Sequence, residues 1–151
     1  MTELSPPSRL LHVFLCHSSA DKPAVRELYN KLHSAGFKPW LDEEDLLPGQ
    51  DFPYEISKAV RNSDAVIICL SRDSVSKEGF VQREIKYAVD VALEKPKGTI
   101  FLIPLKLEEC EVPDEMGHLH WIKLFEGTGF SQLVKALQHR AEKLGLTGNL
   151  P

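Results

Sequence analysis

The sequence has few cysteines and no long apolar run. Its three cysteines are an odd number, and Cys16 and Cys69 lie in apolar segments typical of strands, so we expect buried free thiols rather than a disulfide framework. No apolar stretch approaches the ~20 residues that a membrane-spanning helix needs. The first residues also lack the basic start and apolar stretch of a signal peptide. We therefore expect a soluble, cytoplasmic protein with no membrane partner.

An excess of basic residues is missing as well. Lys and Arg total 18 against 22 Asp and Glu, which gives a formal net charge of −4. Surfaces that bind nucleic acid are usually clearly basic. Direct contact with nucleic acid is therefore not expected.

The common signatures of nucleotide and metal sites are absent too. Residues 17–21 (HSSAD) follow the first apolar run without the glycines of a dinucleotide fingerprint or the Lys of a P-loop. A phosphoacceptor receiver domain would need acidic residues where this chain has His17 and Ser71. Cys110, His118 and His120 match no strong zinc pattern. We expect no metal and no cofactor.

Short apolar runs alternate with amphipathic helical patterns along the 151 residues. Strands are expected at residues 11–16, 37–41, 65–70 and 99–105, with a weaker one at 121–124. Helices are expected at 21–35, 52–62, about 81–92 and 130–144. Asp21 should cap the first helix, Gly36 should end it in a left-handed conformation, and Pro104 should fall at a strand end.

This alternation predicts parallel pairing through right-handed crossovers. The expected fold is α/β and flavodoxin-like, an open sheet of about five parallel strands with helices on both faces. Residues 1–10 are expected to be a disordered N-terminal segment, 11–144 one domain, and 145–151 a tail or linker. Ligands in such folds bind at the carboxyl ends of the strands, so residues just after Cys16, Leu41, Leu70 and Leu105 are the first candidates.

The helix after the third strand carries an unusual pair. Phe80 and Glu84 are one turn apart on the same side, and Glu84 flanks the apolar stripe that contains Val81 and Ala88. A carboxylate beside an aromatic ring at the edge of a buried face suits an acid, a base or a cation-stabilising group. On periodicity alone, a solvated helical Glu is the commoner outcome.

A loop at residues 42–51 is acidic at its start and partly apolar at its tip. Residues 42–45 (DEED) precede Leu46, Leu47, Pro48 and Gly49, and the Pro-Gly pair suits a tight turn. Such a loop can dock on a basic surface, which Arg83, Lys86, Lys95 and Lys97 supply. The pattern therefore raises self-association as a hypothesis, against the ordinary reading of a solvated run of charges.

In this order, the segments resemble the Toll/interleukin-1 receptor (TIR) domain family along nearly all of residues 11–144. Residues 12–21 (HVFLCHSSAD) look like its first box, 36–42 (GFKPWLD) like its second strand, and 46–50 (LLPGQ) like the tip of its BB loop. Residues 62–71 (NSDAVIICLS) look like its third strand, and 76–88 (SKEGFVQREIKYA) resemble the stretch that holds the family's catalytic glutamate.

The family includes scaffolding modules and enzymes that cleave the nicotinamide–ribose bond of NAD+, and the resemblance to its prokaryotic enzymes implies that NAD+ is the substrate here. Glu84 would be catalytic. Phe80 stands where the enzymes often have Trp, and His17, Trp40, Asp42 and Ser71 would line the pocket. Homotypic TIR–TIR association through the BB loop would switch activity on, in a setting such as prokaryotic antiviral defence.

Two alternatives stay open beside the enzyme. The chain could be a protein-interaction scaffold in which Glu84 only solubilises a helix, since fold alone does not establish function. It could also be a sensor that binds NAD+ or a cyclic nucleotide product without cleaving it. The sequence does not distinguish hydrolysis from cyclisation.

Overall fold

A parallel sheet forms the centre of the fold in the computed structural model, which describes residues 9–41, 45–76 and 80–146. Its strands are β1 (His12–Cys16), β2 (Lys38–Trp40), β3 (Ala65–Leu70), β4 (Leu102–Lys106) and β5 (Ile122–Lys123), in the order β2-β1-β3-β4-β5. Every neighbouring pair is parallel. This is the flavodoxin-like order, and the predicted fold class is confirmed.

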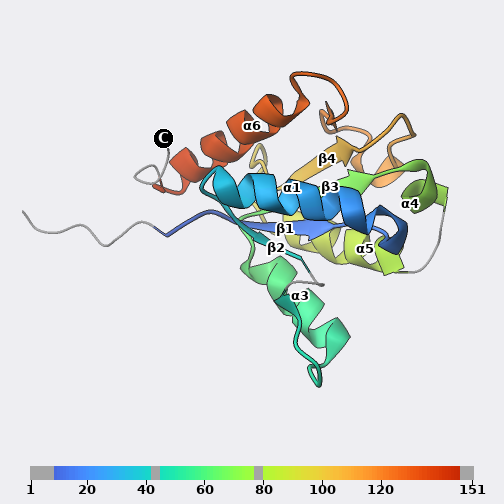
Figure 1. Ribbon diagram of the computed structural model, residues 1–151. Coiled ribbons are helices and arrows are strands. Elements are labelled where there is room, and N and C mark those ends of the chain that lie inside the picture. The colour runs from blue at the N-terminus through green and yellow to red at the C-terminus, as the bar shows by residue number, and fades with distance from the viewer. Residues whose placement is uncertain (1–8, 42–44, 77–79, 147–151) are drawn as a thin grey trace, which may run out of the picture.

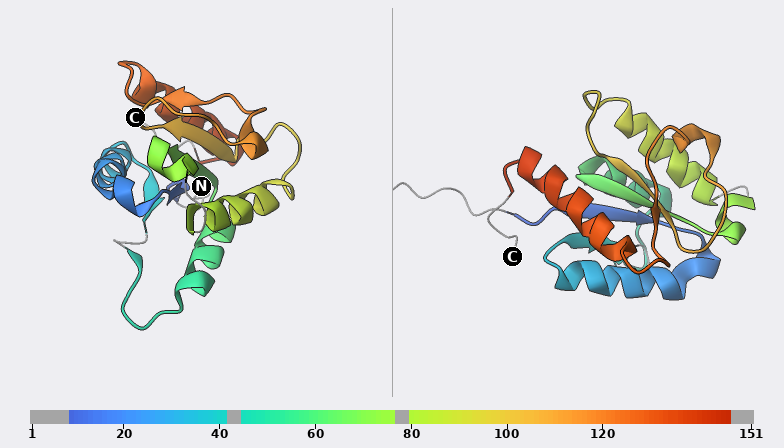
Figure 2. Two further views of the ribbon diagram at one scale, coloured as in Figure 1. Left: turned by 90° about the vertical axis from the view of Figure 1, so that its right-hand side faces the viewer. Right: turned by 90° about the horizontal axis from the view of Figure 1, so that it is seen from above.

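Helices cover both faces of the sheet (Figures 1 and 2). They are α1 (Lys22–Ser34), α3 (Phe52–Asn62), α4 (Arg72–Ser76), α5 (Phe80–Ala92) and α6 (Gly129–Lys143), with short 3-10 turns at Ser19–Asp21 (η1) and Asp114–Met116 (η2). None of the helices in the described ranges is both long enough and apolar enough to span a lipid bilayer.

Two apolar clusters, one on each face, hold the layers together. The first packs α1 and α6 on side chains such as Leu15 and Ile67, and the second packs α3 and α5 on side chains such as Phe14 and Ile68. Neighbouring strand residues point to opposite faces, and all six residues of β3 are buried. Cys16 and Cys69 are free buried thiols, as predicted.

The ends of α1 confirm one predicted signal and correct another. Gly36 has φ of 95°, and the Phe37 amide bonds to the Leu32 carbonyl at 3.0 Å, as in a glycine-terminated helix. Asp21 does precede α1, but its side chain makes no cap hydrogen bond. The carboxylate instead accepts a hydrogen bond from Ser71, so the capping prediction is wrong.

Pro104 does not fall at a strand end, contrary to prediction, but in the middle of β4. The Phe101 carbonyl accepts from Val66 of β3, and the Leu107 amide donates to Leu70, so the odd-numbered residues between them face β3. The nitrogen of Pro104 therefore faces β5, whose pairing begins only at Leu105. Because this nitrogen faces away from β3, the missing N–H breaks no hydrogen bond to β3.

Candidate functional site

The carboxyl ends of β1 and β3 lie side by side, where the sheet order reverses. The chain leaves β1 toward β2 on one side and leaves β3 toward β4 on the other. Such a switch point is where ligands bind in open α/β sheets. Figure 1 places the start of α1, all of α4 and the start of α5 at this same end of the sheet.

A polar network joins the two strand ends. Ser71 Oγ donates to Asp21 Oδ2 at 2.6 Å, and Ser18 Oγ lies 2.9 Å from the same oxygen. Ser18 Oγ also lies 3.3 Å from an Asp73 carboxylate oxygen. Ser18 and Ser71 are both buried. The network fixes the chain after β1 against the chain after β3, and so gives the switch point a rigid polar floor.

Ser74 extends this floor into α4. Its hydroxyl accepts from the Ser71 amide at 2.8 Å, and its own amide donates to Ser71 Oγ at 3.1 Å. Sequence reasoning missed the part that Ser18, Asp21, Asp73 and Ser74 play here. The available signal was their position directly after two strands that the predicted order places together.

His17 lies at the same strand end but is almost covered. It is 3% exposed, and its Nδ1 lies 3.4 Å from the carbonyl oxygen of Leu15. A carbonyl can only accept, so a bond there places a proton on Nδ1. His17 and Ser71 were both predicted as substrate contacts. The structure brings them to the same edge of the sheet, where both side chains are buried.

Trp40, a third predicted contact, ends β2 on the face that α3 and α5 cover. Its ring stacks on Phe14 with centroids 5.1 Å apart and planes 12° apart. Phe14 is buried and Trp40 is partly exposed. Asp42 lies outside the described residues.

Glu84 and Phe80 both lie in α5, in agreement with the predicted helix. Phe80 is the first residue of α5 and Glu84 is one turn further, a spacing that puts both on one side of the helix. The helix packs on the same apolar cluster as Trp40. The side chains of residues 80–85 are outside the described part of the chain, among them that of Arg83, whereas Lys86 is exposed.

The tip of the predicted BB loop is a tight turn. The Gln50 amide bonds to the Leu47 carbonyl at 3.1 Å, and Gly49 has φ of 93°, as the third residue of a type II turn with Pro48 second. The Gln50 side chain closes the turn by accepting from the Leu47 amide at 2.7 Å. Leu47 is left 66% exposed, and the tip projects from the body of the fold (Figures 1 and 2).

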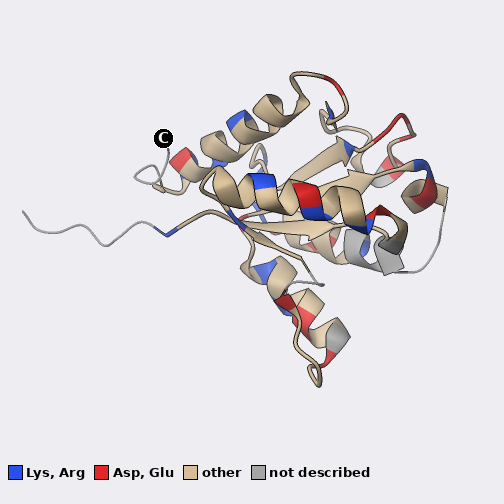
Figure 3. Cartoon of the chain, in the orientation of Figure 1, with Lys and Arg blue, Asp and Glu red and all other residues tan. Residues whose placement is uncertain are grey.

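The other two cations predicted to receive this loop, Lys95 and Lys97, come after the end of α5. Lys95 Nζ lies 5.0 Å from the centroid of the Phe101 ring, and Lys97 lines a pocket at the opposite end of the sheet. The side of the molecule drawn in Figure 3 carries both signs of charge, mixed over its helices and loops.

Comparison with known proteins identifies the family. The TIR domain family model matches residues 13–137. NAD(+) hydrolase TcpA of Theionarchaea archaeon is 37% identical over 86 residues, which are 56% of this chain and 26% of TcpA. The probable 2' cyclic ADP-D-ribose synthase TcpO of Methanobrevibacter olleyae is 32% identical over 62 residues, 40% of this chain and 18% of TcpO. The chain thus spans about a quarter or less of these relatives.

The fold is also similar to that of solved TIR domains. The TIR domain of the Toll-related receptor TRR-2 from Hydra magnipapillata superposes with a TM-score of 0.70 at 21% identity, covering 83% of this chain and 97% of that domain. This likeness concerns the fold alone. Together with the family match over most of the sequence, it shows that the chain belongs to the TIR domain family.

Proposed function

We propose that this TIR domain cleaves the bond between nicotinamide and ribose in NAD+, with NAD+ as substrate and no separate cofactor. The observation that carries the proposal is the placement of Glu84 on α5, a helix that begins at the switch-point edge of the sheet. Relatives named as an NAD(+) hydrolase and a probable cyclic ADP-D-ribose synthase support it.

A single carboxylate suffices for this chemistry. Nicotinamide leaves as a neutral molecule because its ring nitrogen is already cationic in NAD+, so no general acid is needed. Positive charge develops on the ribose, as in glycoside cleavage, and a nearby carboxylate stabilises it. We assign that role to Glu84. Attack by water then gives ADP-ribose, and attack by a nucleophile within the molecule gives a cyclic isomer.

The other residues have positioning roles in this proposal. Phe80 stacks on the nicotinamide ring, since an aromatic face suits a planar partner. Trp40 offers a partly exposed ring on the same face of the sheet as α5. His17 and Ser71 are nearly covered, so we propose that they hold the floor of the pocket and that Asp42 completes its wall.

Self-association belongs to the same proposal. The exposed tip formed by Leu46, Leu47, Pro48 and Gly49 docks on a second copy of the domain near Arg83 and Lys86 and completes its pocket. Activity then depends on local concentration, as suits a signalling domain of immune defence. A protein-interaction scaffold is the second candidate, because the exposed Leu47 side chain would serve assembly equally well without catalysis.

The deciding experiment measures nicotinamide release from NAD+ by the domain at high concentration and when tethered in clusters. Glu84→Gln keeps the size of the side chain and removes its charge. We expect it to lose at least about a hundredfold in rate, the usual effect of removing a group that stabilises transition-state charge. Asp90→Asn is the matched control, because Asp90 is exposed on the same helix.

Circular dichroism melting curves establish that all three proteins are folded. Equal release by Glu84→Gln and wild type would remove Glu84 from the mechanism. A folded, clustered wild type that releases no nicotinamide would overturn the enzyme and leave the scaffold. Stabilisation by NAD+ without turnover would identify a sensor.

A further inference from the structure

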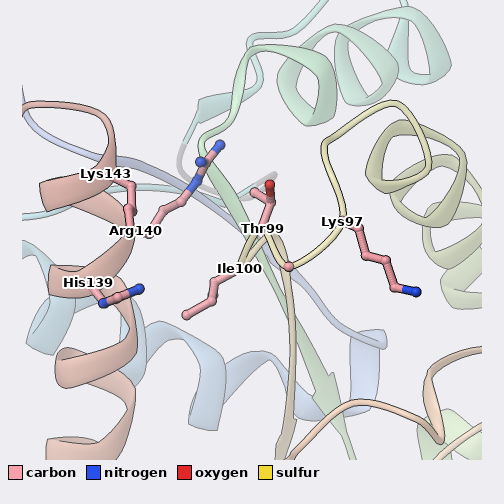
Figure 4. Close-up of a pocket in the computed structure, with 7 residues that line it drawn as sticks. Lys97, Thr99, Ile100, His139, Arg140 and Lys143 are labelled. Atoms are coloured by element: carbon pink, nitrogen blue, oxygen red, sulfur yellow. The ribbon is translucent and has the colours of Figure 1, made fainter.

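A second pocket lies at the opposite end of the sheet, between the loop before β4 and the last turns of α6. It has a volume of about 280 Å3. From the loop it is lined by Lys97, Gly98, Thr99 and Ile100, and from α6 by His139, Arg140 and Lys143. Figure 4 shows the Arg140 guanidinium and the Thr99 hydroxyl reaching toward the same region, with Lys97 on the far wall and its ammonium directed outward.

The charge of this lining is of one sign. Three of its residues are Lys or Arg, His139 is a fourth nitrogen donor, and no Asp or Glu is among the lining residues in the described part of the chain. The whole chain carries a net charge of −4, so a cluster of cations is not expected from its overall composition. Within residues 9–41, 45–76 and 80–146, no carboxylate forms an ion pair with Lys97, Arg140 or Lys143.

The helix dipole explains part of this pattern but not all of it. Basic residues favour the last turn of a helix, where the carbonyl ends are negative, and Arg140 and Lys143 stand there in α6. Lys97 comes from a different element. It sits in a turn that the Thr99 amide closes on the Pro96 carbonyl at 3.1 Å, with Gly98 at φ of 89°, which aims the loop at α6.

Arg140 is held by a neutral backbone carbonyl, which does not neutralise its positive charge. Its Nε donates to the backbone carbonyl of Asp64 at 2.9 Å, which orients the guanidinium. The Asp64 carboxylate is occupied by Arg9, at 2.6 and 3.0 Å, and by the His12 amide at 2.8 Å. The Asp64 carboxylate is therefore committed to another cation, and the remaining N–H donors of the Arg140 guanidinium suit an incoming anion.

We propose that this pocket binds the phosphate groups of a small phosphorylated metabolite. Arg140 and Thr99 contact the phosphate oxygens, and Lys97 and Lys143 supply the surrounding charge. The volume is close to the lower limit of ordinary ligand pockets, roughly 300 Å3, so a mono- or diphosphate end enters and the rest of the ligand stays outside. The pocket lies away from the candidate catalytic edge, and the inference does not depend on NAD+ cleavage.

The test titrates the whole domain with pyrophosphate, ADP and adenosine at constant ionic strength, and follows backbone amide shifts by NMR. Pyrophosphate and ADP should both saturate shifts at Gly98, Thr99 and Ile100, and adenosine should not. Lys97→Glu combined with Lys143→Glu should weaken binding of both ligands by at least about tenfold, because two positive charges beside the phosphate are replaced by two negative ones. Lys135→Glu, an exposed change on the same helix outside the pocket, should leave binding within about twofold.

Equal binding of pyrophosphate and ADP supports a phosphate site, and tighter ADP binding adds a nucleotide preference. No saturable shift in wild type would overturn the proposal. So would an equal loss in Lys135→Glu, since that indicates general charge attraction, or adenosine binding as tightly as ADP. Tighter binding of a single-stranded oligonucleotide than of either small phosphate would replace it with a nucleic-acid surface.

Discussion

Asp64, at the entry to β3, shows how one buried side chain couples stability to pH. Its side chain is 10% exposed and that of Arg9 is 51% exposed. Burial alone would raise the pKa of Asp64, but the hydrogen bonds from Arg9 and from the His12 amide, together with the Arg9 charge, hold it below its ordinary value of 3.8. The folded protein therefore binds a proton at Asp64 less readily than the unfolded chain does.

The stability that Asp64 contributes should be present above its ordinary pKa and lost as the pH falls through the lower folded pKa. We expect Asp64→Asn to reduce the free energy of unfolding by about 1–3 kcal/mol at pH 7, the usual cost of disturbing a charge-assisted bond. The deficit should shrink below about pH 4. Urea denaturation of both proteins from pH 7 to pH 2 measures this, and a deficit independent of pH would contradict it.

The elements themselves were largely predictable, because their signals are local. The unbroken apolar run of β3 and the periodicity of α3 and α5 gave the right segments within a few residues. The capping prediction for Asp21 was wrong because the sequence before a helix is the same whether an Asp caps that helix or binds a distant strand end. The prediction for Pro104 was wrong because a proline is tolerated inside β4 only if its nitrogen faces an unpaired part of the sheet, which depends on where β5 begins. Helix α4 was not anticipated, since five residues show no helical period.

Helix α6 depends on a close approach that only glycine permits. A Cβ at Gly129 would fall on the Lys123 carbonyl oxygen and lie 2.8 Å from the Cα of Leu124, both backbone atoms that cannot turn aside. Gly129→Ala should therefore force the start of α6 away from β5. We expect a loss of about 1–3 kcal/mol, typical of overpacking, measured by urea denaturation.

Gly127→Ala is the control for this change. Gly127 lies two residues earlier, and a Cβ there would meet nothing within 4 Å. Its free energy of unfolding should stay within about 0.5 kcal/mol of wild type. If both substitutions cost the same, the effect belongs to chain flexibility before α6 and not to the contact with residues 123 and 124.

For the molecule as a whole, the sequence predicted where a site would be but not how it is built. Parallel strand order follows from alternating patterns, and the switch-point edge follows from the order. The side-chain contacts at that edge cannot be predicted in this way, because they join residues about fifty positions apart, as the hydrogen bond between Ser71 and Asp21 shows. The roles of Glu84 and Phe80 came from resemblance to the TIR family, since helical spacing alone favours a solvated carboxylate.

The last prediction concerns two copies of the domain. Leu47 is 66% exposed in the turn at the loop tip and Leu93, beyond the end of α5, is 79% exposed, so Leu47→Lys and Leu93→Lys add the same charge at two open sites. Both variants should keep the free energy of unfolding of wild type to within about 0.5 kcal/mol. If the turn docks near Arg83 and Lys86 of a second copy, only Leu47→Lys should abolish the concentration-dependent increase in sedimentation coefficient, because the new cation would face like charges at the contact. Loss of association in both variants would point to a general charge effect, and loss in Leu93→Lys alone would move the interface to the far end of α5.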